Sequence, residues 1–240
     1  MIYDVLPVLG EISRDQIIQI AHFLVALYLS ISFHEAAHAW MANRCGDDTA
    51  RLMGRMTLNP VVHIDPIGTI LMPLLMVVSP LLMPGGHVAP LIGWAKPVPV
   101  NPLRFRQMRR GEILVSLAGP VSNFILAAAS IVTYWLVLAL ARAFGVLGQG
   151  PPIVTMLLRF LESLMALNLI LGLFNLIPIP PLDGSHILGV LISRETAAKL
   201  ERFLVPPLNF IILLFVAIPL VRLLAGPVFL MADFVLHIWW

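Results

Sequence analysis

Long apolar segments, several of them near or above 20 residues, dominate this 240-residue chain. Hydrophobic residues make up 59% of the sequence and charged residues only 12%. A soluble domain carries roughly twice that share of charge, which it needs to cover a surface in water. An apolar helix of about 20 residues is long enough to cross the hydrocarbon core of a bilayer. The sequence therefore predicts an all-α polytopic membrane protein.

The apolar segments predict about four to six transmembrane helices in a single membrane-embedded domain. That domain covers residues 1–240, with a core at about 16–193 and C-terminal membrane helices at about 203–240. The second segment contains Pro73 and Pro80, so the sequence leaves open whether it spans the membrane or re-enters. The segments cover residues 16–43, 67–83, 112–144, 153–176 and 203–224, with shorter apolar stretches at 185–192 and 227–240.

The stretch from 85 to 102, GGHVAPLIGWAKPVPVNP, differs from the helical segments around it. It is rich in glycine and proline, and apolar residues alternate around Val98 and Val100, which favours extended backbone over helix. Irregular backbone at membrane depth is tolerated only where protein or water covers its polar groups. We expect a re-entrant, partly extended hairpin that lines a cavity.

The charge pattern predicts an orientation and limits the partners. The net charge is only +2, and no basic block with interleaved aromatic residues is present, which argues against nucleic acid as a partner. Cys45 is the single cysteine, so an intramolecular disulfide and a cysteine-based zinc site are both excluded. Loops rich in Lys and Arg stay in the cytoplasm, which places the N-terminus outside. The basic clusters are Arg44, Arg51 and Arg55; Arg104, Arg106, Arg109 and Arg110; and Arg194, Lys199 and Arg202.

The run HEAAH, from His34 to His38, lies within the first apolar segment. Residues four apart share one face of a helix, so both imidazoles can bind one metal ion. Glu35 would then act as general base on the attacking water. The alternative is a helix end whose polar side chains reach into the headgroup layer. Ionisable side chains inside an apolar segment are costly and usually functional, which favours the metal site.

A zinc hydrolase usually has three protein ligands, so one more acid or histidine is required. Asp183 follows the proline-rich run IPIPP and precedes Gly184, at the point where the fourth apolar segment ends. An aspartate between apolar residues is hard to explain as a solvated loop residue. The alternative is that Asp183 caps a short helix that begins near Ser185.

The two motifs together, HEAAH and NLIPIPPLDG, resemble those of the site-2 protease family of intramembrane zinc metalloproteases (M50 type). The resemblance extends over about residues 30–190 and includes LAGPVSNF, where Gly119, Pro120 and Asn123 match a GPxxN element. It implies that His34, His38 and Asp183 bind one Zn²⁺. It also implies that Asn175, eight residues before Asp183, holds substrate or stabilises the oxyanion. The chain resembles the compact members that lack PDZ and CBS domains.

The resemblance implies a zinc metalloendopeptidase that performs regulated intramembrane proteolysis. Its substrate would be a membrane-anchored protein with a transmembrane segment, cut within or near that segment. The expected location is a bacterial or archaeal inner membrane, with the active site toward the cytoplasm. Two alternatives are a metal or ion transporter that uses the His/Asp cluster, and a catalytically silent relative. The sequence leaves open the substrate's identity, the oligomeric state and the roles of His63, His87 and His186.

Overall fold

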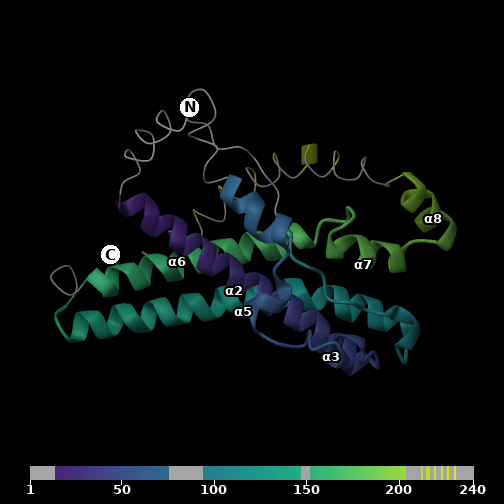
Figure 1. The fold of residues 1–240 in the computed structure, drawn as a ribbon, viewed down its shortest axis with the longest axis horizontal. Helices are drawn as coiled ribbons and strands as arrows, with labels where there is room; N and C mark the ends of the chain where they lie inside the picture. The colour runs from purple at the N-terminus through teal and green to yellow at the C-terminus, as the bar shows by residue number, and fades with distance from the viewer. Residues whose placement is uncertain are drawn as a thin grey trace.

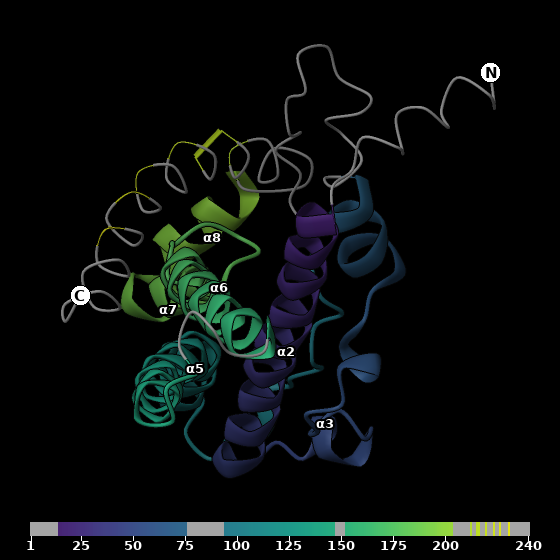
Figure 2. The ribbon, with the colours of Figure 1, turned by 90° about the vertical axis from the view of Figure 1, so that its left-hand side faces the viewer.

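Three long helices form the centre of the computed structural model, which describes residues 14–75, 94–146 and 152–203 and a few single positions between 212 and 230. They are α2 (Arg14–Cys45), α5 (Met108–Ala143) and α6 (Pro152–Asn175). Each is long and apolar enough to cross a membrane. Figure 1 shows α5 and α6 side by side, and Figure 2 shows α2 running across them at a steep angle. The all-α membrane fold is thus confirmed.

Shorter helices connect and flank these three. One of them, α8, contains five charged residues among its ten and was not predicted from the sequence. The shorter elements are α3 (Thr49–Leu52), the 3₁₀-helix η1 (Pro60–His63), the π-helix η2 (Pro66–Leu71), the 3₁₀-helix η3 (Pro102–Arg104), α7 (Asp183–Leu191) and α8 (Arg194–Phe203).

Small residues let α5 and α6 approach closely, as is usual between membrane helices. A Cβ atom at Gly172 of α6 would lie 2.7 Å from the ring of Phe124 on α5, so glycine leaves room for that ring. Further along the pair, large side chains fill the space between the helices. This buried cluster consists of Ala127, Tyr134, Leu138, Leu161 and Met165.

One side of α5 presents apolar side chains to the outside of the protein. Their spacing of about four residues puts them on a single face of the helix. A helix of 36 residues is about 54 Å long, well beyond the roughly 30 Å of a hydrocarbon core. The helix therefore tilts or projects from the bilayer, with this face against lipid. The exposed residues are Val121, Ile125, Val132, Leu136 and Leu140.

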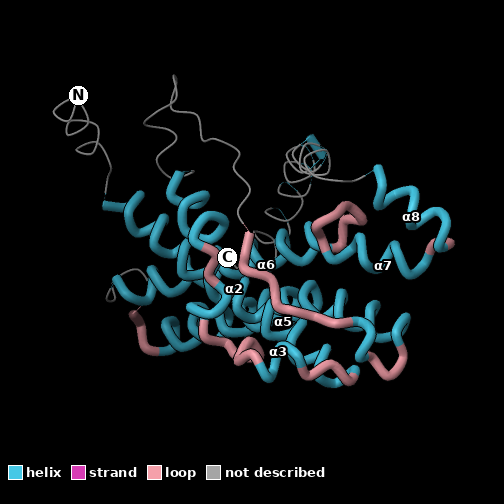
Figure 3. The backbone as a smooth tube through the Cα atoms, turned by 45° about the vertical axis from the view of Figure 1, so that its right-hand side comes forward, coloured by secondary structure: helices cyan, strands magenta, loops and turns pink. Residues whose placement is uncertain are grey.

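An extended stretch, residues 94–101, leads into η3 and α5 and appears as loop in Figure 3. Backbone hydrogen bonds tie it to the η1–η2 region: Trp94 N donates to Gly68 O at 3.2 Å, and Lys96 N donates to His63 O at 3.0 Å. No β-strand is formed in the part of the chain that the structure describes. This stretch is the second half of the expected hairpin.

Several sequence predictions lie outside the described residues. The first half of the hairpin, with His87, falls in the gap from 76 to 93. The described part of segment 67–83 is helical as far as residue 75, so spanning and re-entry both stay open. Most of residues 204–240 are also outside, so the total of four to six membrane helices and the division into a core and C-terminal helices stay predictions.

Candidate metal centre

Helix α2 brings His34 and His38 together near its C-terminal end. Their spacing of four residues stacks them on one face, and their Nε2 atoms lie 3.0 Å apart. The ring planes meet nearly at right angles, with an interplanar angle of 79°. His38 is buried, and His34 is partly buried. Both rings thus direct the same nitrogen toward one point between α2 and α5.

Asp183 reaches the same point from α7. The prolines after Asn175 end α6, and the chain turns before Leu182. The Oδ2 atom of Asp183 lies 3.2 Å from His34 Nε2, and its Oδ1 atom lies 3.3 Å from His38 Nε2. Leu182 takes the N-cap position of α7 without a side-chain capping bond. The helix-capping alternative for Asp183 is therefore wrong.

The converging atoms of His34, His38 and Asp183 can bind a metal ion but cannot satisfy one another by hydrogen bonds. The Nδ1 atom of His38 lies 2.7 Å from Val115 O, and a carbonyl oxygen only accepts, so Nδ1 carries the proton. His38 Nε2 then presents a lone pair toward His34 Nε2 and the Asp183 carboxylate. The Oδ2 atom of Asp183 is buried without a hydrogen-bond partner. Three electron-pair donors that converge in this way are satisfied by a cation.

The spacing of these atoms also fits zinc. Four ligands placed tetrahedrally at about 2.0–2.1 Å from zinc lie roughly 3.3 Å from one another. The separations between the three side chains here are 3.0, 3.2 and 3.3 Å. Two imidazoles and one carboxylate are also a ligand set found in zinc hydrolases, where the fourth position stays open.

Two glycines make the close approach of these residues possible. A Cβ atom at Gly119 of α5 would overlap Nε2 of both His34 and His38, so only glycine leaves the space between the rings free. A Cβ atom at Gly184 would overlap the backbone carbonyl oxygens of Leu176 and Ile177. Gly184 therefore lets the start of α7 pack against the end of α6, which holds Asp183 in place.

Glu35 and Asn175 do not belong to the three-residue group in this structure. Glu35 Oε2 accepts a hydrogen bond of 2.9 Å from the backbone N–H of Val98, in the extended stretch 94–101. Asn175 is the last residue of α6, and its Nδ2 atom donates to Leu171 O at 3.0 Å. The extended stretch 94–101 thus contacts the residue that directly follows His34.

Two further histidines, His63 and His186, and the nearby Asp65 have other surroundings. His63 is buried, and its Nε2 atom lies 2.9 Å from Thr57 O. Asp65 caps η2 by accepting from the backbone N–H groups of Ile67 and Gly68. His186 is exposed on α7. None of these three belongs to the metal-ligand group found among the described residues.

The sequence analysis did not single out two buried polar residues behind His34. Asn168 of α6 and Ser30 of α2 are fully buried and joined by a hydrogen bond of 2.8 Å from Asn168 Nδ2 to Ser30 Oγ. The signal was available, because a polar residue inside a long apolar helix is rare and often functional. Asn168 is the one asparagine between Met156 and Phe174 in its segment.

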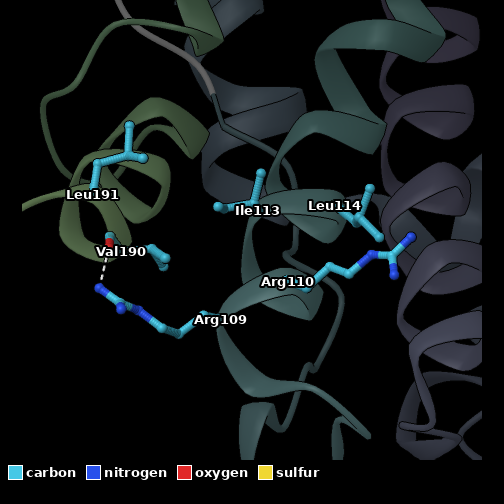
Figure 4. Close-up of a pocket in the computed structure, with 6 residues that line it drawn as sticks. All are labelled: Arg109, Arg110, Ile113, Leu114, Val190 and Leu191. Atoms are coloured by element: carbon cyan, nitrogen blue, oxygen red, sulfur yellow. Dashed lines mark hydrogen bonds between the residues drawn. The ribbon is translucent and has the colours of Figure 1, made fainter.

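Two hollows lie outside the metal-ligand group. One, of about 770 Å³, lies between the N-terminal parts of α2 and α6 and includes His22 and Glu162. The other, of about 460 Å³, lies between the start of α5 and the end of α7. Figure 4 shows Arg109 beside this second hollow, where its guanidinium donates to Val190 O at 2.9 Å. That bond ties the N-terminal end of α5 to α7.

Comparison with known proteins gives a consistent result. The model of peptidase family M50 matches residues 22–149 and 139–218. The chain is 41% identical over 181 residues to YwhC of Bacillus subtilis, which is described as a zinc metalloprotease, and covers 74% of that protein. It is 32% identical to the zinc metalloprotease Rip2 of Mycolicibacterium smegmatis over 58% of that protein. It is 35% identical to the regulator of sigma-E protease RseP of Escherichia coli over 25% of that protein.

These matches cover 75%, 72% and 49% of the present chain, in the same order. No solved structure matches the chain. The transporter alternative finds no support in these relatives, whereas zinc dependence agrees with the donor set of His34, His38 and Asp183. The chain therefore belongs to peptidase family M50, the site-2 protease family, as an integral membrane zinc metalloprotease.

Proposed function

We propose that His34, His38 and Asp183 hold the zinc ion, that Glu35 moves the proton, and that Asn175 contacts the substrate. The observation that carries this assignment is the convergence of two imidazole nitrogens and a carboxylate within 3.0–3.3 Å of one another. The three side chains come from α2 and α7, and Gly119 leaves the space between them free.

Bound zinc would polarise the scissile carbonyl and make water acidic enough to attack near neutral pH. Glu35 takes the proton from the attacking water and later delivers it to the leaving amine. Its position one residue after His34 turns its side chain about 100° around α2 from that ligand. A carboxylate accepts several hydrogen bonds, so Glu35 can keep the 2.9 Å bond from the Val98 N–H, which orients it, while it takes the proton from the water.

Asn175 stands where α6 ends and the turn toward Asp183 begins. Its amide donates within the helix to Leu171 O, a bond that it can exchange for one to a substrate carbonyl. An amide donor aimed at a developing oxyanion is worth about 3–4 kcal/mol of transition-state stabilisation in a protease. Asn175 would therefore affect the rate of cleavage more than the binding of zinc.

A transmembrane substrate must unwind before it is cut, because the amides of a helix are protected by its own hydrogen bonds. Extended backbone next to the active site can pair with an unwound peptide by strand addition. The stretch 94–101 lies against Glu35 through Val98, which supports a role for the predicted hairpin in holding substrate.

The active site is proposed to lie toward the cytoplasmic side of a bacterial or archaeal cell membrane. The C-terminal end of α2, the start of α5 and the end of α7 lie together: Arg106 N donates to Cys45 O, and Arg109 donates to Val190 O. Basic residues gather at this end, which suits the cytoplasmic face. At 1.5 Å per residue, His34 and His38 lie roughly 10–16 Å from the end of α2.

The substrate class is a membrane-anchored protein with a transmembrane segment, cut within or near that segment as part of regulated proteolysis. RseP, one of the relatives, is named for regulating a sigma factor, sigma-E. Such a site suits a regulator whose soluble part is released when its membrane anchor is cut.

The test is cleavage of a single-span reporter protein co-reconstituted with the purified full chain in liposomes. The parent should release the soluble part of the reporter, and added chelator should stop the release. Glu35→Gln should keep its zinc and lose cleavage by at least about 10³-fold, in the range lost when acid–base catalysis is removed. Cleavage by Glu35→Gln at the parent rate would contradict the assignment.

A further inference from the structure

A line of buried hydrogen bonds leads away from the metal-ligand group into the protein. The Nδ1 atom of His34 lies 2.7 Å from Asn123 Oδ1 on α5. Asn123 Nδ2 donates to Asn168 Oδ1 on α6 at 2.8 Å. Asn168 Nδ2 donates in turn to Ser30 Oγ, back on α2, at 2.8 Å. Asn123, Asn168 and Ser30 are all 0% exposed.

The partners of Asn168 and Ser30 determine which atoms donate and which accept along this chain of hydrogen bonds. Asn168 Nδ2 also donates to the backbone carbonyl of Leu164 at 2.7 Å, and Ser30 Oγ donates to the carbonyl of Ala26 at 2.6 Å. A carbonyl oxygen only accepts hydrogen bonds. If the amide of Asn168 were turned around, two acceptors would face each other at 2.7 Å in a buried site. The amide nitrogen of Asn168 therefore points to Leu164.

The orientation of the Asn168 amide determines which atoms donate in the remaining hydrogen bonds, up to His34. Because the amide nitrogen of Asn168 donates to Leu164 O, its amide oxygen faces Asn123. The group of Asn123 that donates to this oxygen must be its amide nitrogen. Asn123 is left with its oxygen toward His34, so His34 Nδ1 must carry the proton. The lone pair of His34 consequently lies on Nε2, the atom that faces His38 and Asp183.

We propose that Asn168, acting through Asn123, is a positioning residue that sets the tautomer and the ring orientation of His34 for metal binding. This inference rests on the proposed function, because it takes His34 to be a zinc ligand. The two residues are called the amide pair below. A group behind a ligating histidine that accepts from its second nitrogen typically strengthens metal binding 10- to 100-fold.

The amide pair has a backbone counterpart at the other histidine. His38 Nδ1 donates to the carbonyl of Val115, which belongs to the main chain of α5. His38 thus needs no side chain for its orientation, whereas His34 depends on the amide pair. The pair also explains why α6, an apolar helix without any of the three ligands, carries a fully buried asparagine facing α2 and α5.

The first experiment measures zinc affinity of the detergent-purified full chain by competition with a chelator. Asn168→Leu removes the amide with little change of volume and should weaken zinc binding about 10- to 100-fold. The control is Met165→Leu, one turn away on the same helix and 1% exposed, which should stay within about threefold of the parent. An equal loss in both variants would mean a packing effect and would overturn the proposal.

A second pair of variants separates positioning from structural support at Asn123. As a neutral carboxylic acid, the residue in Asn123→Asp keeps both bonds of the amide: one oxygen accepts from His34 Nδ1, and the hydroxyl donates to Asn168 Oδ1. This variant should therefore retain zinc affinity better than Asn123→Leu by at least about tenfold. If Asn123 served the fold alone, the leucine would be the milder change, because a carboxylate buried without a matching charge is strongly destabilising. The reverse order of zinc affinities would overturn the proposal, even if Asn168→Leu failed to fold.

The absorption spectrum of bound Co²⁺ adds a readout of ligand geometry that does not depend on activity. Asn168→Leu should change the visible bands of the Co²⁺ form, and Met165→Leu should leave them as in the parent. His34→Ala distinguishes the proposed metal site from the proposed role of the amide pair. If His34→Ala binds metal like the parent, the proposed metal site itself fails. If His34→Ala loses metal while Asn168→Leu matches the parent in affinity and spectrum, only the role of the amide pair fails.

Discussion

Gly119 lies so close to His38 that a single methyl group at position 119 would overlap the Nε2 atom of the imidazole. The glycine belongs to a helix, where glycine is less favourable than alanine by about 0.5–1 kcal/mol. Its place in the middle of α5 therefore reflects the space that the two imidazoles need.

Gly119→Ala should lower zinc affinity at least about tenfold, because the added methyl displaces the ring nitrogens of His34 and His38 from their ligand positions. The control is Gly189→Ala on α7, where an added Cβ meets nothing within 4 Å. Chelator competition measures both variants. Parent-like zinc binding by Gly119→Ala would show that this contact does not shape the site.

Gly184→Ala should also weaken the site, but through the backbone. Its Cβ would overlap the carbonyl oxygens of Leu176 and Ile177, so the start of α7 must move away from α6 and carry Asp183 with it. We expect both zinc content and thermal stability to fall, with a loss of about 1–3 kcal/mol typical of overpacking. Gly189→Ala, on the same helix, is again the matched control. A variant with normal stability and full zinc would contradict this role of Gly184.

The backbone N–H of Val98 is expected to help orient Glu35. Val98→Pro removes that donor, and position 98 lies in extended backbone where proline is tolerated. A hydrogen bond to a charged group is worth about 1.5–3 kcal/mol, so cleavage should fall roughly tenfold or more while zinc content stays unchanged. Val98→Ala keeps the N–H and shows the effect of the lost side chain alone. Equal cleavage rates in the two variants would show that the Val98 N–H does not orient Glu35.

Asp47, at the junction between α2 and α3, should make the free energy of unfolding depend on pH. Burial alone would raise the pKa of Asp47, but hydrogen bonds from Asn101 N–H and from Thr49 outweigh it and hold the pKa below its ordinary value of 3.8. The ionised carboxylate therefore stabilises the folded protein above about pH 4, and this contribution is lost as pH falls through the lowered pKa.

Asp47→Asn should accordingly lower stability near pH 7, by about 1.5–3 kcal/mol for the lost charged hydrogen bonds. The difference in melting temperature between parent and variant should shrink as pH is lowered from 6 to 3. Thermal unfolding in detergent measures it, and the comparison cancels the titration of other carboxylates. A difference that stays constant over this range would mean that ionisation of Asp47 contributes nothing.

The main helices could be predicted because apolar length alone determines where a chain crosses a bilayer. The segment predicted at 16–43 became α2 (Arg14–Cys45), and the one at 153–176 became α6 (Pro152–Asn175). The prolines between Asn175 and Asp183 correctly marked the end of α6. The amphipathic helix α8 was missed, since its many charges gave no membrane signal.

The details of the site depended on contacts between distant segments, which a single sequence does not reveal. HEAAH indicated two ligands because their spacing is local to one helix. The bond between Glu35 and Val98, and the link from His34 through Asn123 to Asn168, join different elements and required the packed structure. Gly119 was noted as part of a family element, but its closeness to both imidazoles followed only from the fold.

Zinc X-ray absorption on the purified full chain tests the central claim most directly, namely that His34, His38 and Asp183 form one zinc site. The parent should hold about one zinc ion per chain, with two imidazole nitrogens and oxygen ligands at about 2.0–2.2 Å. Asp183→Ala should lose most of its zinc, or show one protein oxygen fewer, and His38→Ala should lose an imidazole. A parent spectrum without imidazole ligands, or an Asp183→Ala spectrum identical to that of the parent, would contradict the account.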